Sequence, residues 1–267
     1  MTRHVQRRRR RGWSYSPPAS SHLTWPEDCI RCYGGRPVAF SWYGADLHVH
    51  TGLSPCASDD MSPVRIVRRA AEAGVSILGI TDHNSAENVA AVVAAAAGSG
   101  VHVLPGMEAQ TREEVHVICL FDQVDQAMGL QEYVYCTLPD FPYSPGAFGR
   151  QILYGADDSV RGECRKPLYA AAGLSLSEFS EEVRKRGGLI IAAHVDRPAF
   201  SVLGTLGFIP PDVPFDALEV RNRGAIGQVP GYRHVWSSDA HRVDDVGLAM
   251  TAFYLREVNV EELRMAF

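Results

Sequence analysis

The chain has 267 residues, of which 46% are hydrophobic and 21% charged, a composition typical of a globular protein with one sizeable core. No apolar run reaches the roughly 18 residues that a transmembrane helix needs, so we expect no membrane partner. The net charge of −5 is unevenly distributed, because residues 1–40 carry +6 and the remainder −11. An acidic body argues against a general nucleic-acid-binding surface and is compatible with a site that concentrates cations.

Residues 1–40 differ in composition from the rest of the chain. They contain eight arginines and many Ser and Pro without apolar periodicity, which predicts a disordered tail in front of a single domain at 41–267. The run Arg7–Arg11 is also compatible with a nucleic-acid or membrane-surface patch. No apolar segment follows this run as in a secretory signal, so we expect a cytoplasmic protein with reduced thiols. Cys29 and Cys32 have the spacing of half a zinc site, without a second pair nearby.

From residue 41 the pattern alternates between short strands and helices. Strands are expected at 45–50, 76–81, 101–109, 115–121, 189–193, 217–220, 235–237 and 251–255, and helices at 63–73, 86–97, 176–186 and 259–267. Residues 122–174, with many Gly, Pro and Tyr, are expected to form a long irregular insertion over the site. This order is typical of parallel βα units, and about seven strands could close into a barrel or form an open sheet.

Histidines gather at the ends of these strands or lie inside a short strand beside other polar groups. Six of the ten histidines fit this description: His48, His50, His83, His116, His194 and His241. In parallel α/β folds the carboxyl ends of the strands meet at one edge, and ligand sites gather there. His48 and His50 are two residues apart on a strand, so both imidazoles project to one face and can hold one ion. The alternative for such a pair is a solvated strand face.

Carboxylates extend the same pattern. Asp239 pairs with His241 at the spacing of the first two histidines, and Glu108 follows an apolar run where its two oxygens could bridge two ions. Mixed imidazole and carboxylate ligation suits Zn, Mn or Fe and not Ca. About eight candidate ligands oversupply one ion, so we expect two or three divalent ions. Such a cluster lowers the pKa of a bound water and neutralises phosphate oxygens.

Together these residues resemble the PHP (polymerase and histidinol phosphatase) family. The matching motifs, in the family's order, are His48-x-His50, Thr81-Asp82-His83-Asn84, Pro105-Gly106-x-Glu108, the isolated His116, Ala193-His194 and Ser238-Asp239-Ala240-His241. The resemblance implies a distorted (β/α)7 TIM-like barrel that hydrolyses phosphoesters through a metal-bound hydroxide at a two- or three-metal site. The ligands it implies are His48, His50, His83, Glu108, His116, His194, Asp239 and His241.

One position departs from the family pattern. The family commonly has an Asp ligand five residues after the second His of the first motif, where this chain has Pro55. Asp59 or Asp60 could reach back if the loop is longer. Otherwise the third metal position is weakened or empty, although the binuclear centre is not affected.

Phosphate binding requires cationic or amide donors. Arg197 follows His194, and Asn222 and Arg223, with Arg221 beside them, follow the strand predicted at 217–220. Arg197, Asn222 and Arg223 are therefore candidates for binding phosphate, or else ordinary surface side chains of an arginine-rich protein. The candidates for catalysis by proton transfer are Asp82, Asp239 and His241.

These residues favour a phosphoesterase that acts on a nucleotide, the 5′-end of a short oligonucleotide or a small phosphomonoester. Its partner would be a small phosphorylated substrate or a short single-stranded nucleic-acid end. A C–N hydrolase of the amidohydrolase type is one alternative, but many such enzymes bridge their metals with a carboxylated lysine, and neither Lys166 nor Lys185 stands at a strand end. A metal-binding scaffold that has lost catalysis is the other, and Pro55 keeps it open.

Overall fold

The computed structural model describes residues 39–222, 224, 227 and 229–267, which belong to one compact unit. The expected tail with Arg7–Arg11, the Cys29 and Cys32 pair, and the candidate Arg223 lie outside the described residues. Among the helices that the structure describes, none is both long enough and apolar enough to cross a bilayer.

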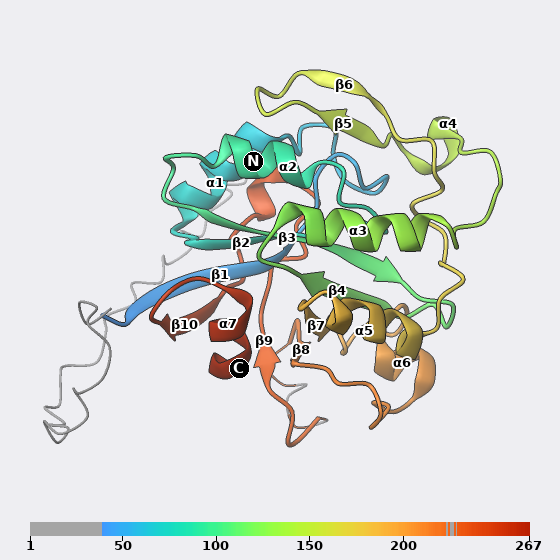
Figure 1. Ribbon diagram of the computed structural model, residues 1–267. Helices are drawn as coiled ribbons and strands as arrows, with labels where there is room; N and C mark the ends of the chain where they lie inside the picture. Colours follow the sequence, from blue (N-terminus) through green and yellow to red (C-terminus); the bar gives the residue numbers. More distant parts are fainter. Residues whose placement is uncertain (1–38, 223, 225–226, 228) are drawn as a thin grey trace, which may run out of the picture. The chain divides into compact units, whose positions relative to one another are not determined.

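Strands and helices alternate through most of the chain, as the sequence pattern predicts (Figure 1). The strands are β1 (Ser41–Val49), β2 (Ile77–Ile80), β3 (His102–Gln110), β4 (His116–Leu120), β5 (Ile152–Tyr154), β6 (Val160–Glu163), β7 (Leu189–Ala192), β8 (Ala217–Glu219), β9 (His234–Val235) and β10 (Thr251–Leu255). The helices are α1 (Pro63–Ala73), α2 (Val89–Ala95), α3 (Val124–Tyr135), α4 (Pro145–Phe148), α5 (Leu176–Lys185), α6 (Val202–Leu206), the 3-10 helix η3 (Val243–Asp245) and α7 (Val260–Ala266).

Eight strands form one mixed sheet in the order β10-β1-β2-β3-β4-β7-β8-β9. Neighbours from β1 to β3 and from β7 to β9 are parallel, whereas β4 is antiparallel to both of its neighbours and β10 is antiparallel to β1. The segment after β9 closes the barrel, because Ala240 pairs in parallel with Val49 and accepts a hydrogen bond from the His50 amide at 3.0 Å. The expected distorted (β/α)7 TIM-like barrel is confirmed, with β10 added beside β1.

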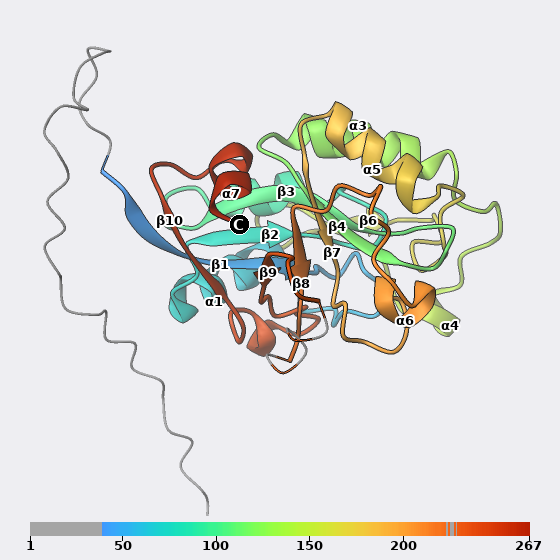
Figure 2. The ribbon, with the colours of Figure 1, turned by 90° about the horizontal axis from the view of Figure 1, so that it is seen from below.

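The strands of the barrel bury both faces. One apolar cluster combines strand residues with residues of α1, α2, α3 and α5, and helices α3 and α5 lie together over β3, β4 and β7 (Figures 1 and 2). The other cluster lies between the strands and α7 and contains Leu104 of β3 and Ile118 of β4. Because side chains alternate along a strand, Glu108 lies on the same face of β3 as Leu104, and His116 lies on the same face of β4 as Ile118. The polar residues therefore cap this second cluster at one end of the barrel.

The segment 122–174 is more regular than expected. Residues 124–135 form α3, which buries Ala127, Leu130 and Val134 at helical spacing and begins with a capping box between Gln123 and Gln126. The expectation of irregular structure is wrong here, because the short apolar stripe was hidden among polar and aromatic residues. Strands β5 and β6 form a hairpin that packs on the loop after β1, where the amide of Ile152 donates to the Gly52 carbonyl oxygen at 2.7 Å.

Candidate metal centre

Six histidines and two carboxylates gather at the end of the barrel where β1, β2, β3, β7 and β9 finish and the antiparallel β4 begins. All are buried or partly buried, and each of these strands or the turn after it contributes at least one of them. The structure thus brings together all eight candidate metal ligands: His48, His50, His83, Glu108, His116, His194, Asp239 and His241.

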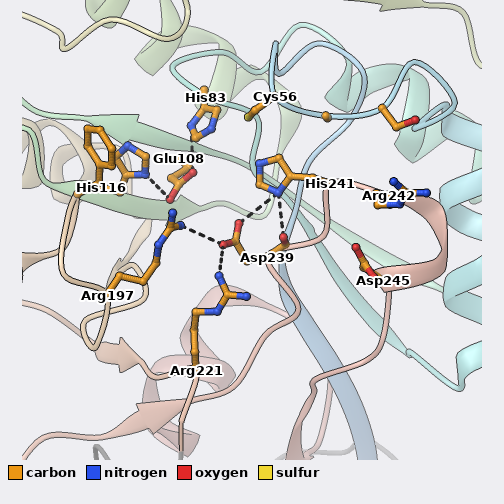
Figure 3. A pocket seen from close by; sticks show the side chains of 13 residues that line it. Cys56, His83, Glu108, His116, Arg197, Arg221, Asp239, His241, Arg242 and Asp245 are labelled. Carbon is orange, nitrogen blue, oxygen red and sulfur yellow. Dashed lines mark hydrogen bonds and ion pairs between the residues drawn. The ribbon is translucent and has the colours of Figure 1, made fainter. Parts of the chain in front are cut away.

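Glu108 lies at the middle of this cluster (Figure 3). Its Oε1 is 2.9 Å from His116 Nδ1 and 3.0 Å from His194 Nε2. Its Oε2 faces three other imidazole nitrogens at 3.0–3.4 Å, those of His83, His48 and His50. The two oxygens of one carboxylate therefore face two different sets of histidines, which is the arrangement of a carboxylate that bridges two ions.

The donor atoms of the cluster lie close enough together for several of them to bind one divalent ion. Three overlapping groups each bring one donor atom per residue within 4.8 Å: His50 with His83 and His241, His48 with His50 and Asp239, and His83 with Glu108 and His116. The Nε2 atoms of His48 and His50 face each other at 3.0 Å, and the buried Nδ1 of His194 has no hydrogen-bond partner. Because buried polar atoms are normally satisfied, converging and unpaired nitrogens indicate ligands for a cation.

The pKa values of the titratable side chains in this cluster are shifted in different directions. Burial lowers the pKa of His48, but the carboxylates of Glu219, Glu108 and Asp239 outweigh it and raise that pKa well above its usual value. Burial and neighbouring imidazoles hold the pKa of His50 well below its usual value. Burial raises the pKa of Glu108, but the surrounding imidazoles outweigh it, so this pKa is lowered and the carboxylate stays charged. A cluster with charged buried carboxylates attracts cations.

The backbone turns sharply at two of these residues. His194 and Asp239 have φ angles of 30° and 52°, in the left-handed region that residues other than glycine seldom adopt. His194 follows the end of β7 and Asp239 lies four residues beyond β9, so each turn brings a polar side chain toward the cluster. Strained conformations of this kind persist where the surrounding structure fixes them and concentrate at functional sites.

Glu219 holds two histidines of the cluster in position, and it was not among the residues selected from the sequence. Its two oxygens lie 3.1 and 3.0 Å from His48 Nδ1, and its Oε2 accepts a hydrogen bond from the His194 amide at 2.8 Å. The side chain is buried at the carboxyl end of β8. The only sequence signal was a carboxylate inside the buried strand Ala-Leu-Glu-Val, where an unpaired charge would be costly.

Replacement of Glu219 by Gln should weaken metal binding while the fold is kept. Carboxylates that orient a histidine ligand typically contribute 10- to 100-fold to metal affinity, so a loss of that size is expected. Competition of the loaded protein with a chelator measures it. Glu181→Gln is the matched control, because Glu181 is exposed on α5. Equal affinities in the two variants would contradict an orienting role for Glu219.

Asp82 lies outside the residues that line the cavity of the centre. It is fully buried, its Oδ1 accepts hydrogen bonds from the Thr51 amide and the Ser54 hydroxyl, and its Oδ2 accepts one from the Thr51 hydroxyl, at 2.6–2.7 Å. The Ser54 hydroxyl in turn lies 2.9 Å from His50 Nδ1. Asp82 thus fixes the loop after β1 and, through Ser54, the ring of His50.

The cluster opens into a cavity of about 700 Å³, which is within the usual range for small-molecule sites. Its lining contains three arginines, Arg197, Arg221 and Arg242. The guanidinium groups of Arg197 and Arg221 lie 3.4 and 3.2 Å from Asp239 Oδ2 (Figure 3). The cavity therefore joins the candidate metal ligands to cationic side chains.

The other candidates for phosphate binding lie differently. Asn222 is exposed, and its side-chain oxygen accepts a hydrogen bond from the Gly224 amide, so among the described residues it is not part of the cavity lining. The lining also contains residues that were not selected from the sequence, among them Cys56, Phe200 and Arg242. Phe200 stacks on His116 with ring centroids 5.1 Å apart. No local motif marks these three residues, because loops that are distant in sequence bring them to the cavity.

Burial raises the pKa of Cys56, but hydrogen bonds with His241 and His83 and the charges of these imidazoles outweigh it. The pKa of the thiol falls to about 6. Cys56 keeps one side open to solvent at the mouth of the cavity. A thiol therefore lies in the same cavity as two of the candidate metal ligands, His83 and His241.

A TIM-like barrel with a cluster of histidines and carboxylates at this end defines a metal-dependent hydrolase. Residues 46–191, more than half of the chain, match the family model of the PHP domain, and the protein therefore belongs to the PHP domain family. The family expected from the order of the motifs is thus confirmed. No curated protein sequence matches the chain.

Solved structures share the fold. The lesion-specific endonuclease PfuEndoQ from Pyrococcus furiosus is similar with a TM-score of 0.62 and 19% identity, over 85% of this chain and 56% of that chain. Endonuclease Q in complex with a 27-mer duplex substrate with an abasic lesion at its active site gives 0.59 and 19%, with the same coverage. A protein from Bifidobacterium adolescentis assigned as a metal-dependent phosphoesterase gives 0.55 and 18%, over 84% of this chain and 95% of that chain. This chain spans about half the length of the two endonuclease chains.

Proposed function

We propose that the protein is a phosphoesterase, with a nucleotide, the 5′-end of a short oligonucleotide or a small phosphomonoester as its substrate. The observation that supports this best is the presence of Arg197 and Arg221 in the same cavity as the candidate metal ligands. Both guanidinium groups reach Asp239 and so lie beside the reacting end of the site. Guanidinium groups match the charged oxygens of a phosphate, whereas a neutral amide offers them a single uncharged acceptor oxygen.

Each group of residues would have its own role in the reaction. Two or three divalent ions of Mn, Zn or Fe would be held by the three donor groups, and they would supply Lewis acidity toward a phosphate and a water molecule. Arg197 and Arg221 would bind non-bridging phosphate oxygens. His241 donates Nδ1–H to the Asp239 carbonyl oxygen at 2.9 Å, which leaves its Nε2 to hold an ion or a proton. Asp239 and His241 then act at the reacting end, and Asp82 is a positioning residue.

The position of the lysines disfavours the amidohydrolase alternative. Lys166 and Lys185 are the only lysines in the chain. Lys166 lies beside Tyr135, at the end of α3, and Lys185 pairs with Glu182 at 2.7 Å on the outside of α5. Neither side chain lines the cavity, so neither can bridge ions in the way that a carboxylated lysine does.

Nucleic-acid phosphates are the first substrate class to test. Among the structures of similar fold, Endonuclease Q binds a DNA duplex with an abasic lesion at its active site. The residues from 41 onward carry a net charge of −11, which disfavours contact with a long polyanion. A short or single-stranded end that enters the cavity avoids most of this repulsion.

The test combines metal content with phosphate release from the purified full chain loaded with Mn or Zn. We expect two or three ions per chain, and phosphate release from a nucleotide, a 5′-phosphorylated oligonucleotide or a small phosphomonoester that a chelator abolishes and added metal restores. Amide hydrolysis without phosphate release would favour the amidohydrolase alternative. Less than one ion per chain without turnover would favour the scaffold.

A further inference from the structure

The loop after β1 differs from the family pattern at the point where it meets the cavity. Pro55 has no ligand atom in its side chain. The two nearby carboxylates are paired elsewhere, because Asp59 contacts Arg150 at 3.0 Å and Asp60 contacts Arg65 at 3.2 Å. Neither carboxylate lines the cavity of the centre. The sequence left open that Asp59 or Asp60 reaches into the centre. In the described structure neither carboxylate does so.

The neighbour of Pro55 faces the centre instead. Cys56 lines the cavity together with His241 and His83. In Figure 3 its sulfur lies between these two imidazoles. His241 and His83 also belong, with His50, to one of the groups that could hold an ion. The thiol is thus next to two donors of a candidate metal position.

The loop holds Cys56 in this place from several sides. The Ala57 amide donates to the Ser54 carbonyl oxygen at 2.9 Å, and the Ser58 amide donates to the His241 carbonyl oxygen at 2.9 Å. Gly149 packs so tightly on the loop that a Cβ there would collide with the Pro55 carbonyl oxygen. The segment around Cys56 therefore contacts both the backbone of His241 and Gly149 of the segment 122–174.

We propose that Cys56 is a sulfur ligand of the ion held by His83 and His241, in the place where the family uses an Asp. The proposal rests on the metal centre proposed above. A thiolate is a softer ligand than a carboxylate, and thiolate with imidazole suits Zn, whereas carboxylate with imidazole also accepts Mn. Cys56 would then fill the third metal position that Pro55 leaves without a ligand and would bias it toward zinc.

Cobalt(II) spectroscopy tests this ligand directly, without any turnover. A cobalt–thiolate bond gives a charge-transfer band in the near ultraviolet that imidazole and carboxylate ligands do not give. The full chain loaded with cobalt should show the band, and Cys56→Ser and Cys56→Asp should lose it. Cys136→Ser is the matched control and should keep it, because Cys136 is exposed at the end of α3. The difference between variants removes any signal from Cys29 and Cys32.

Competition between zinc and manganese gives a second readout. Cys56→Asp introduces the family's type of ligand one residue beyond the family's position and should shift the preference toward manganese by at least about tenfold relative to the unmodified chain. A cobalt-loaded chain without the band, a band that persists in Cys56→Ser, or a chain that binds no cobalt would overturn the proposal. If the band follows Cys56 but no phosphate ester is hydrolysed, the ligand assignment stands and the phosphoesterase proposal fails.

Discussion

Replacement of Glu108 by Gln should abolish turnover and reduce the metal content while the protein remains folded. Among the described residues, only Glu108 has two carboxylate oxygens that face different sets of histidines, at 2.9–3.4 Å. Gln has nearly the same volume but no charge, and its NH₂ group cannot serve as a ligand. If the bridge supplies about 5 kcal/mol of transition-state stabilisation, kcat falls by roughly 10⁴-fold. Metal content by mass spectrometry and phosphate release measure the two losses.

Glu257→Gln is the control for this replacement, because Glu257 is exposed just beyond β10. Circular dichroism of both variants checks that the barrel is intact. We expect the control to keep its ions and its activity. A Glu108→Gln variant that binds as many ions as the control and turns over at the same rate would show that Glu108 does not bridge ions.

The barrel and the ligand cluster could be predicted because their signals are local. Pro63 in the first turn and Gly74 at the stop gave the bounds of α1, and Gly74 adopts the left-handed conformation expected of a helix end. The candidate ligands stand at strand ends, and the topology of a barrel brings strand ends together without further information. A list of strand ends with their polar residues therefore already describes most of the cluster.

Supporting residues could not be predicted because their partners are far away in the sequence. Glu219 and His48 are 171 residues apart, and nothing near either residue indicates that they meet. Cys56 is equally inconspicuous, since His241, which lines the same cavity, lies far from it in the sequence. For Cys56 the useful signal was negative, because Pro55 in a ligand position left a place for a different side chain.

The direction in which the side chains of a loop point could not be predicted from the sequence either. Asp196 accepts hydrogen bonds from the amides of Arg221 and Asn222 at 2.9 and 2.8 Å and so fixes the turn after β8. In this turn the side chain of Arg221 enters the cavity and that of Asn222 does not. A shift of one residue along a loop changes which side chain faces a site, and composition alone cannot determine it.

Loss of both Arg197 and Arg221 should weaken phosphate binding without loss of the ions. A charged hydrogen bond contributes about 2 kcal/mol, so each single Ala variant should lose roughly 30-fold in kcat/KM and the double variant about 10³-fold. The effects can depart from additivity, because both groups contact Asp239 Oδ2. Phosphate release gives kcat/KM, inhibition by inorganic phosphate gives affinity, and mass spectrometry gives the metal content.

This pair of residues separates the phosphoesterase from the C–N hydrolase more sharply than any metal ligand does. Loss of a ligand damages either enzyme, whereas loss of Arg197 and Arg221 harms only an enzyme whose substrate carries negative oxygens. Arg68→Ala is the control, because Arg68 is exposed on α1 and pairs only loosely with Glu72 at 3.9 Å. If inorganic phosphate inhibits the double variant as strongly as this control, these arginines do not bind phosphate, and the main support for the phosphoesterase is removed.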